Sequence, residues 1–163
     1  MRKLFLFGLI VIILSQGCSK STNPLNLINC DGLVTDTLGT NDNGRIYMPN
    51  AFTPNGDGLN DISRPLTVNI SSISFTIYDE NNNVVFTTAQ LNQGWATTVP
   101  SNSFIKYYYK IQGVTTGNHR IGACGDLYKL SCRPANAPVL SFEDQITPFG
   151  FTGPTHEALA TCL

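Results

Sequence analysis

Charged side chains are scarce in this chain. Only 13% of its 163 residues are Asp, Glu, Lys or Arg, and the formal net charge is −1 at pH 7. The Lys and Arg residues are spread along the sequence and form no basic run. A protein that binds DNA or RNA needs a basic surface that neutralises phosphates. The composition therefore excludes nucleic-acid binding as the function.

The motifs of common enzyme classes are missing as well. The sequence contains no Gly-x-Ser-x-Gly, no His-Glu-x-x-His and no Cys-x-x-Cys, which are patterns of hydrolases, metalloproteases and zinc sites. Glu143 and Asp144 are adjacent carboxylates. Neighbouring residues on an extended segment point to opposite faces, so these two cannot work together as an acid and a base. We therefore predict a protein that is not an enzyme.

The N-terminus has the pattern of an export signal. Arg2 and Lys3 precede an unbroken apolar run at residues 4–14, which is too short to span a bilayer and has the length of a signal-peptide core. The sequence Ser-Gln-Gly then leads into Cys18. A small residue directly before a cysteine resembles the lipobox of bacterial lipoproteins, in which the cysteine is diacylated and becomes the mature N-terminus. The resemblance implies a signal peptide at residues 1–17 and a lipid on Cys18; an ordinary signal peptide cut elsewhere is the alternative.

Four cysteines remain if Cys18 carries lipid. An even number of cysteines in an oxidising compartment indicates two disulfides, with three possible connectivities. We favour one bond that ties the segment after the lipid to the last strand and another that closes the C-terminal segment on the domain. These pairs are Cys30 with Cys124 and Cys132 with Cys162. Free thiols and metal binding are the less favoured alternatives.

Apolar and polar residues alternate with period two from Arg45 onward, and no helical periodicity follows the signal. An alternating strand at residues 73–78, a turn at residues 79–83 and an apolar run at residues 84–86 predict a hairpin. Further strands are predicted at residues 105–111 and 120–130, and an edge strand at residues 46–52, because Pro49 cannot donate a hydrogen bond. This pattern predicts an all-β fold, an immunoglobulin-like antiparallel β-sandwich of about seven strands.

The last thirty or so residues are rich in proline, yet they also contain Leu140, Phe142, Phe149 and Phe151. That is too much apolar surface for a free tail, so we predict an irregular extension that packs on the sandwich. Phe142 is expected to dock it, with the polar residues that follow in solvent and a short helical turn near residues 157–160. The predicted organisation is a signal peptide at 1–17, a polar tether at 18–44, a β-sandwich at 45–132 and a Pro-rich C-terminal extension at 133–163.

The most informative motif is Pro-Asn-Ala-Phe-Thr-Pro-Asn-Gly-Asp-Gly-Leu-Asn-Asp at residues 49–61. It resembles the opening of the gliding-motility-associated C-terminal domain of Bacteroidota, the type B sorting domain of type IX secretion. The resemblance covers roughly residues 45–132 and implies an immunoglobulin-like module with a role in gliding motility and type IX secretion. Later segments also follow that family's order, at residues 75–78, 84–86, 94–95, 107–111 and 125–130.

The same motif is a candidate calcium loop. Asn55, Asp57 and Asp61 place oxygen-bearing side chains at i, i+2 and i+6, Gly58 allows a sharp bend, and the carbonyl of Leu59 would supply a further ligand. This is half of an EF-hand-like pattern, without the first ligand and the bidentate glutamate. The alternative is a structural turn in which the Asn and Asp side chains cap their own backbone.

Together these features predict a non-catalytic, lipid-anchored protein of the cell envelope. We expect an outer-membrane lipoprotein on the periplasmic face or the cell surface, held by its anchor and facing an envelope protein or a glycan. The alternative is a calcium-dependent or carbohydrate-binding surface lipoprotein, with Trp95 and the tyrosines at residues 107–109 as an aromatic platform. Packing within the domain is the favoured role for these rings.

Overall fold

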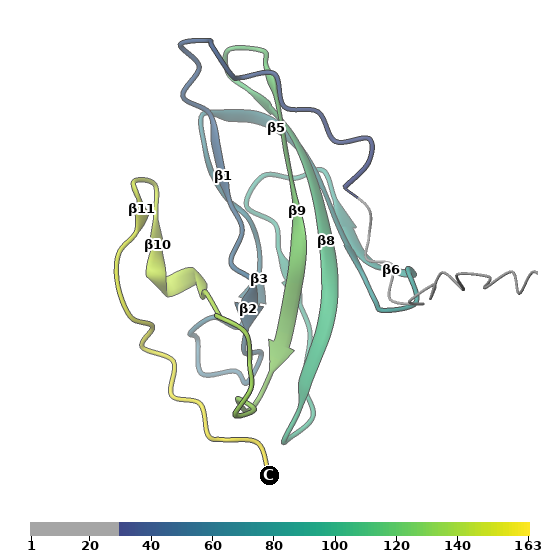
Figure 1. Cartoon of the computed structure of the whole chain (residues 1–163), viewed down its shortest axis with the longest axis vertical. Coiled ribbons are helices and arrows are strands. Elements are labelled where there is room, and N and C mark those ends of the chain that lie inside the picture. Colours follow the sequence, from purple (N-terminus) through teal and green to yellow (C-terminus); the bar gives the residue numbers. More distant parts are fainter. Residues whose placement is uncertain (1–29) are drawn as a thin grey trace, which may run out of the picture.

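The computed structural model describes residues 30–163, so the predicted signal peptide and the predicted lipid attachment at Cys18 lie outside the described residues. Three long strands form the centre of the main sheet: β5 (Ile70–Tyr78), β8 (Phe104–Thr115) and β9 (Arg120–Leu130). Figure 1 shows them side by side. The short strands β2 (Ala51–Phe52) and β6 (Val84–Thr88) complete the sheet in the order β2-β9-β8-β5-β6.

A second layer consists of short strand pairs. Two of these pairs cover the main sheet, because residues on β1 and β7 pack against its buried face; a third lies in the C-terminal extension (Figure 1). The pairs are β1 (Arg45–Tyr47) with β4 (Leu66–Val68), β3 (Ile62–Ser63) with β7 (Trp95–Ala96), and β10 (Ile146–Thr147) with β11 (Gly150–Phe151). The all-β prediction is confirmed. Residues 45–132 contain nine strands where about seven were predicted, because the second layer is broken into short pieces, and the extension adds β10 and β11.

The predicted edge strand at residues 46–52 is divided in two. The buried Pro49 lies between β1, which pairs with β4, and β2, which pairs with β9. Since proline has no backbone N–H, a ladder cannot continue through it. The β2–β9 pairing is parallel, whereas β9, β8, β5 and β6 pair antiparallel. The sheet is therefore not purely antiparallel, and β2 occupies its edge as predicted.

The predicted hairpin is confirmed. β5 pairs antiparallel with β6, with Ile77 opposite Phe86. In the turn between them, the carboxylate of Asp79 accepts hydrogen bonds from the backbone N–H groups of Asn81 and Asn83. A hydrogen bond from the side-chain amide of Asn83 contributes most to lowering the pKa of Asp79, and the two backbone bonds lower it further. A polar turn thus fixes the register that directs the apolar residues of β5 inward.

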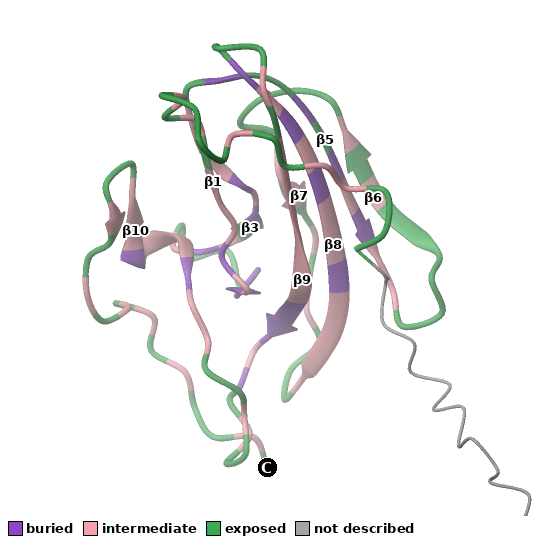
Figure 2. Ribbon diagram, turned by 45° about the horizontal axis from the view of Figure 1, so that its top comes forward, coloured by how far each residue is buried: buried purple, intermediate pink, exposed green. Residues whose placement is uncertain are grey.

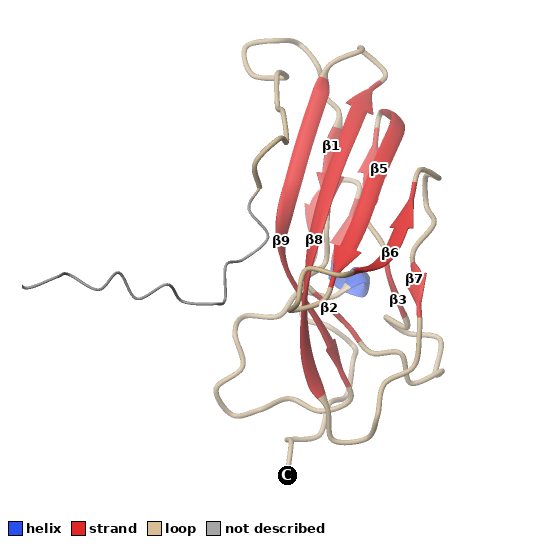
Figure 3. Cartoon of the chain, turned by 90° about the vertical axis from the view of Figure 1, so that its right-hand side faces the viewer, coloured by secondary structure: helices blue, strands red, loops and turns tan. Residues whose placement is uncertain are grey.

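The core follows from the period-two pattern. Alternate residues of β5 point to the same face, where they meet the inward residues of β8 and β9. Figure 2 shows the buried positions running along these strands. The central cluster comprises Phe52, Ile73, Phe75, Ile77, Ile111 and Leu127. No helix in residues 30–163 is long and apolar enough to cross a bilayer. The one helical element among these residues is the short turn η1 (Glu143–Gln145), drawn in blue in Figure 3.

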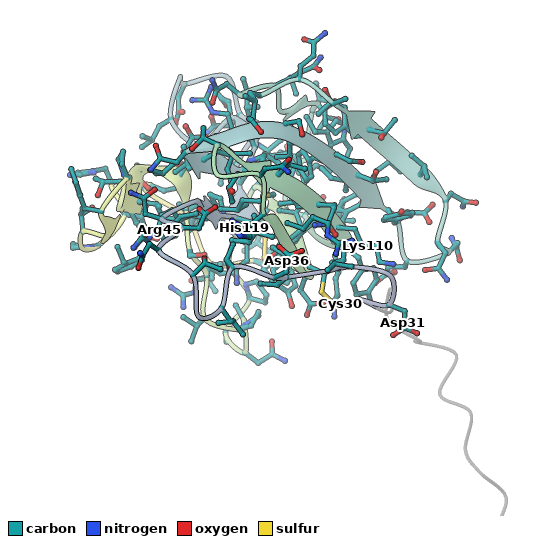
Figure 4. All side chains as sticks on the ribbon, turned by 90° about the horizontal axis from the view of Figure 1, so that it is seen from above. Cys30, Asp31, Asp36, Arg45, Lys110 and His119 are labelled. Carbon is teal, nitrogen blue, oxygen red and sulfur yellow. A yellow bond between two sulfur atoms is a disulfide. The ribbon has the colours of Figure 1, made fainter. Side chains whose placement is uncertain are left out.

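Residues 30–44 lie against the sheet instead of forming a free tether. Figure 4 shows Cys30, Asp36 and His119 along this contact. Cys30 is joined to Cys124 of β9, as predicted, and Asp36 accepts hydrogen bonds from the backbone and side chain of Arg120. This segment is polar but is not a free chain, because its polar groups form hydrogen bonds with residues of the sheet.

The end of this segment is held by Asp42. Its nearly buried carboxylate accepts hydrogen bonds from the hydroxyl of Thr115 and the backbone N–H of Gly44, and it lies 2.9 Å from Nδ1 of His119. The bond from Thr115 contributes most to lowering the pKa of Asp42. The part of the predicted tether from Cys30 to Gly44 thus packs on the sheet, and its remainder lies outside the described residues.

Candidate functional site

The motif segment forms a closed loop directly after β2. The backbone N–H of Thr53 donates to the carbonyl of Asn60 at 2.9 Å, which brings the two ends of the loop together. Gly56 and Gly58 have φ angles of 84° and 89°, a left-handed conformation that favours glycine. The alternation of glycine with Asn and Asp in the motif therefore encodes the path of this loop.

Both aspartates of the loop bind its own backbone. Asp61 accepts from the N–H of Gly56 at 2.7 Å and from that of Gly58 at 2.8 Å. Asp57 accepts from the N–H of Leu59 at 2.8 Å and from the side-chain amide of Asn55 at 3.0 Å. Backbone N–H groups thus compensate the two neighbouring negative charges. This geometry favours the structural turn.

Calcium binding by Asn55, Asp57, Leu59 and Asp61 stays a prediction. The carboxylate oxygens that would bind Ca²⁺ already accept hydrogen bonds. Among residues 30–163, no group of three or more His, Cys, Asp or Glu side chains is placed to hold a metal ion. A bound ion would have to replace several of the hydrogen bonds that shape the loop.

We expect Asp61→Ala to lower the free energy of unfolding by about 1–2 kcal/mol, because two charge-assisted hydrogen bonds are lost at a partly exposed site. Asp57→Ala, which loses one backbone bond, should cost less. The decrease in melting temperature caused by each substitution should be the same in millimolar Ca²⁺ and in EDTA. A wild-type melting temperature that rises by several degrees with Ca²⁺, and no longer does so in Asp61→Ala, would show a calcium site instead.

The C-terminal extension lies on the motif loop. Glu157 accepts hydrogen bonds from the hydroxyl of Thr53 at 2.7 Å and from the side-chain amide of Asn60 at 3.1 Å. Figure 1 shows the extension running beside β2 and β3, on the side away from β6. The second disulfide, Cys132–Cys162, closes this extension, as predicted. The motif and the extension, which are far apart in sequence, thus share one surface.

A cleft of about 370 Å³ opens between the loop and the extension, lined by residues that include Asp61, Arg64 and Glu143. The guanidinium of Arg64 binds Glu143, with Nε at 3.0 and 3.1 Å from its two oxygens. This hydrogen bonding raises the pKa of Arg64. The cleft therefore contains an internally neutralised ion pair.

Phe142 docks the extension as predicted, but the polar residues after it are not in solvent. Glu143 binds Arg64, and Gln145 is buried. Asp144 accepts from the backbone N–H of His156 and the hydroxyl of Thr155. Burial acts to raise the pKa of Asp144, but these hydrogen bonds outweigh it and the net shift is downward. Each polar group has a tertiary partner that the sequence pattern could not show.

Two other expectations about the extension are wrong. Residues 157–160 form no helical turn, and the helical turn is instead η1 (Glu143–Gln145), where the side chain of Gln145 accepts a hydrogen bond from the backbone N–H of Phe142. Phe149 and Phe151 do not pack on the sandwich, since their side chains are 99% and 66% exposed. They lie at the hairpin of β10 and β11, which extends away from the core.

The aromatic rings proposed as a glycan platform pack inside the domain, which was their favoured role. Trp95 lies with its ring centroid 5.5 Å from Phe52 and 4.9 Å from Tyr107. The ammonium group of the buried Lys129 lies over the rings of Trp95 and Tyr107, at 5.3 and 5.4 Å. The protein's own side chains thus contact the rings of Trp95 and Tyr107. Carbohydrate binding stays a prediction, and these contacts do not support Trp95 as its platform.

Sequence reasoning missed Asn50, Asn60 and Glu157, which join the motif to the extension. Asn60 is buried and has a φ of 52°, and its position in the motif was the one available signal. Glu157 lies in a segment without periodicity, so nothing in the sequence indicated its partners. Such contacts depend on how the extension returns to the sheet, which is a tertiary property.

Residues 46–123 match the family model of the CHU_C type IX secretion signal domain. This match begins in β1 and ends within β9, so it covers the motif loop and most of the main sheet. It confirms the resemblance inferred from the motif and links the chain to type IX secretion. Comparisons with curated proteins and with solved structures gave no match.

Proposed function

We propose, from the premise that residues 46–123 form a type IX secretion signal domain, that this chain is a non-catalytic, lipid-anchored protein of the outer membrane. Its β-sandwich serves as an interaction or structural module in type IX secretion and gliding motility. The family match is the single observation that carries the proposal. The anchor is inferred from the apolar run that ends shortly before Cys18.

The geometry supports a module that binds rather than reacts. The motif loop uses its carboxylates on its own backbone, and the ion pair of Arg64 and Glu143 is internally satisfied. The rings of His119 and His156 each lie against a carboxylate, that of Asp42 and that of Asp144 respectively. The domain begins at Cys30, twelve positions after the proposed lipid site. That linker spans at most about 40 Å when extended, so the module stays close to the membrane.

Cys18→Ala is expected to lose membrane association almost completely, because a lipid supplies the affinity that a short polar segment lacks. The full chain is expressed in a bacterium with lipoprotein processing and type IX secretion. Membrane and soluble fractions are compared, and the mass of the mature N-terminal peptide is measured. Ser15→Leu is the matched control: it places leucine three positions before Cys18, where lipoboxes prefer that residue and this chain has Ser15, and it should keep the lipid. An unmodified Cys18 in the wild-type protein would refute the anchor.

The same cells test the link to secretion. Exposure of the module to added protease on intact cells is compared between the parent and a strain without a working type IX translocon. Protection in the mutant strain and digestion in the parent are expected. Equal digestion in both strains would contradict a role for this secretion route, whatever the result for Cys18.

A further inference from the structure

The edge of β2 is hydrogen-bonded to the protein's own extension. The backbone N–H of Ala51 donates to the carbonyl of Ser141 at 3.0 Å. The side chain of Asn50 binds the backbone of the same stretch twice: its Oδ1 accepts from the N–H of Ser141 at 2.7 Å, and its Nδ2 donates to the carbonyl of Val139 at 3.0 Å. All three bonds go to backbone groups of the extension. They would hold any extended peptide in this position, whatever its side chains.

An apolar socket lies beside this edge. Phe142, which is 3% exposed, packs against Ala51 of β2 and against Tyr128 and Leu130 of β9. Tyr128 and Leu130 are two positions apart, so they project from the same face of the strand, opposite to the face of the core residue Leu127. The buried members of the socket thus lie outside the extension, which supplies the aromatic ring that fills it, and Phe104, Leu140 and Leu159 pack around this cluster.

A charged contact follows the socket. Glu143, the next residue after Phe142, makes two hydrogen bonds with Nε of Arg64. An aromatic residue followed by an acid is therefore the side-chain pattern that this surface accepts. Ser141, whose hydroxyl accepts from the backbone N–H of Asn50 at 3.1 Å, adds a preference for a small hydroxyl residue before the ring.

The extension is separable from the core of the domain. The central cluster of the sandwich contains no residue beyond β9. Within residues 133–163, only Phe142 and Gln145 are buried. The extension behaves as a segment bound on a surface, held by one aromatic anchor, a set of hydrogen bonds and the Cys132–Cys162 disulfide.

We propose that the β2 edge, the amide of Asn50 and the socket of Ala51, Tyr128 and Leu130 form a peptide-binding site. The site takes an extended segment with the pattern small hydroxyl, aromatic, acid. In this chain it is occupied by the segment 139–143. Its partner is an extended segment of another protein that adds to the sheet edge in the same way, and the placement of that partner in the cell envelope rests on the proposed function.

The protein's own segment competes with any outside peptide. Tethering gives it an effective concentration of millimolar order, so a free peptide binds the wild-type protein weakly. Removing the aromatic anchor from the extension should open the site, because buried aromatic residues usually carry much of the affinity of such contacts.

The test uses the purified full chain and a fluorescent synthetic peptide with the sequence of residues 137–146. Phe142→Ala is expected to bind this peptide at least about tenfold more tightly than the wild type does. Adding Asn50→Ala to Phe142→Ala should weaken binding again by about tenfold, since two backbone contacts are lost. A peptide with alanine in place of its phenylalanine should not bind. Circular dichroism and thermal melting verify that each variant is folded.

A second variant that frees the peptide-binding site is needed in case Phe142→Ala does not fold. Ser141→Pro removes the N–H that Asn50 accepts but leaves Phe142 and the socket unchanged. Absence of peptide binding to folded Phe142→Ala or folded Ser141→Pro would overturn the proposal. Equal binding to wild type and variants, insensitive to Asn50→Ala, would also overturn it, because the peptide would then bind elsewhere. The measurement uses purified protein, so its outcome is independent of the membrane and secretion experiments.

Discussion

Replacing Cys30 and Cys124 with serine is expected to lower the free energy of unfolding by about 4–5 kcal/mol, and replacing Cys132 and Cys162 by about 3–4 kcal/mol. The order follows from loop length, because the first bond joins residues 94 positions apart and the second joins residues 30 apart. A longer closed loop removes more conformational freedom from the unfolded chain. Typical domains have only about 5–15 kcal/mol of stability, so the first pair of substitutions brings this protein close to unfolding.

Urea unfolding of the two serine pairs and of the wild type, all without reductant, measures this difference. The two loops do not overlap in sequence, so the two losses should be nearly additive in the fourfold variant. A larger loss for the Cys132–Cys162 pair than for the Cys30–Cys124 pair would contradict the loop-length argument. It would indicate that the extension contributes more to folding than its sparse burial suggests.

Phe75→Ala is expected to cost about 3–5 kcal/mol, the range for removing a fully buried aromatic side chain. The side chain of Phe75 is 0% exposed and lies edge-to-face with Phe86 at a centroid distance of 5.7 Å. Its loss leaves a cavity between β5 and the strands that pack on it. Denaturant unfolding followed by circular dichroism gives the change in stability.

Phe149→Ala is the matched control, because it removes the same side chain from a position that is 99% exposed. Its stability should remain within about 0.5 kcal/mol of the wild type. A loss of more than about 1 kcal/mol in this control would show that Phe149 has a packing partner in solution. Near-equal stability of the two variants would mean that the core has been placed wrongly.

The strands of the main sheet were predictable because their patterns are local. Period-two alternation gave β5 and β8, and the polar cluster at residues 79–83 gave the turn of the hairpin. The strand predicted at residues 120–130 matches β9. Short pairs such as β3 with β7 were missed, because two residues carry no periodicity. The parallel pairing of β2 was missed because local sequence does not specify which edge a short strand joins.

The structure contains the favoured disulfide pairing, one of the three that the cysteine count left open. Residues 30–44 and the extension were harder to predict, because their partners are distant in sequence. Asp36 meets Arg120, and Glu157 meets Thr53. Neither hydrophobic periodicity nor a sequence motif indicates such pairs of residues.

By itself, the sequence determined the all-β class, the main hairpin and the family resemblance of the motif, since each depends on local spacing, and it indicated two disulfides with three possible pairings. Only the tertiary structure decided that the motif loop satisfies its own carboxylates and that the extension lies along β2 with Phe142 in a socket. The physical reason is that a hydrogen bond or a buried ring has a partner only once distant segments are brought together. The free energy of those contacts belongs to the folded arrangement and not to any stretch of the chain.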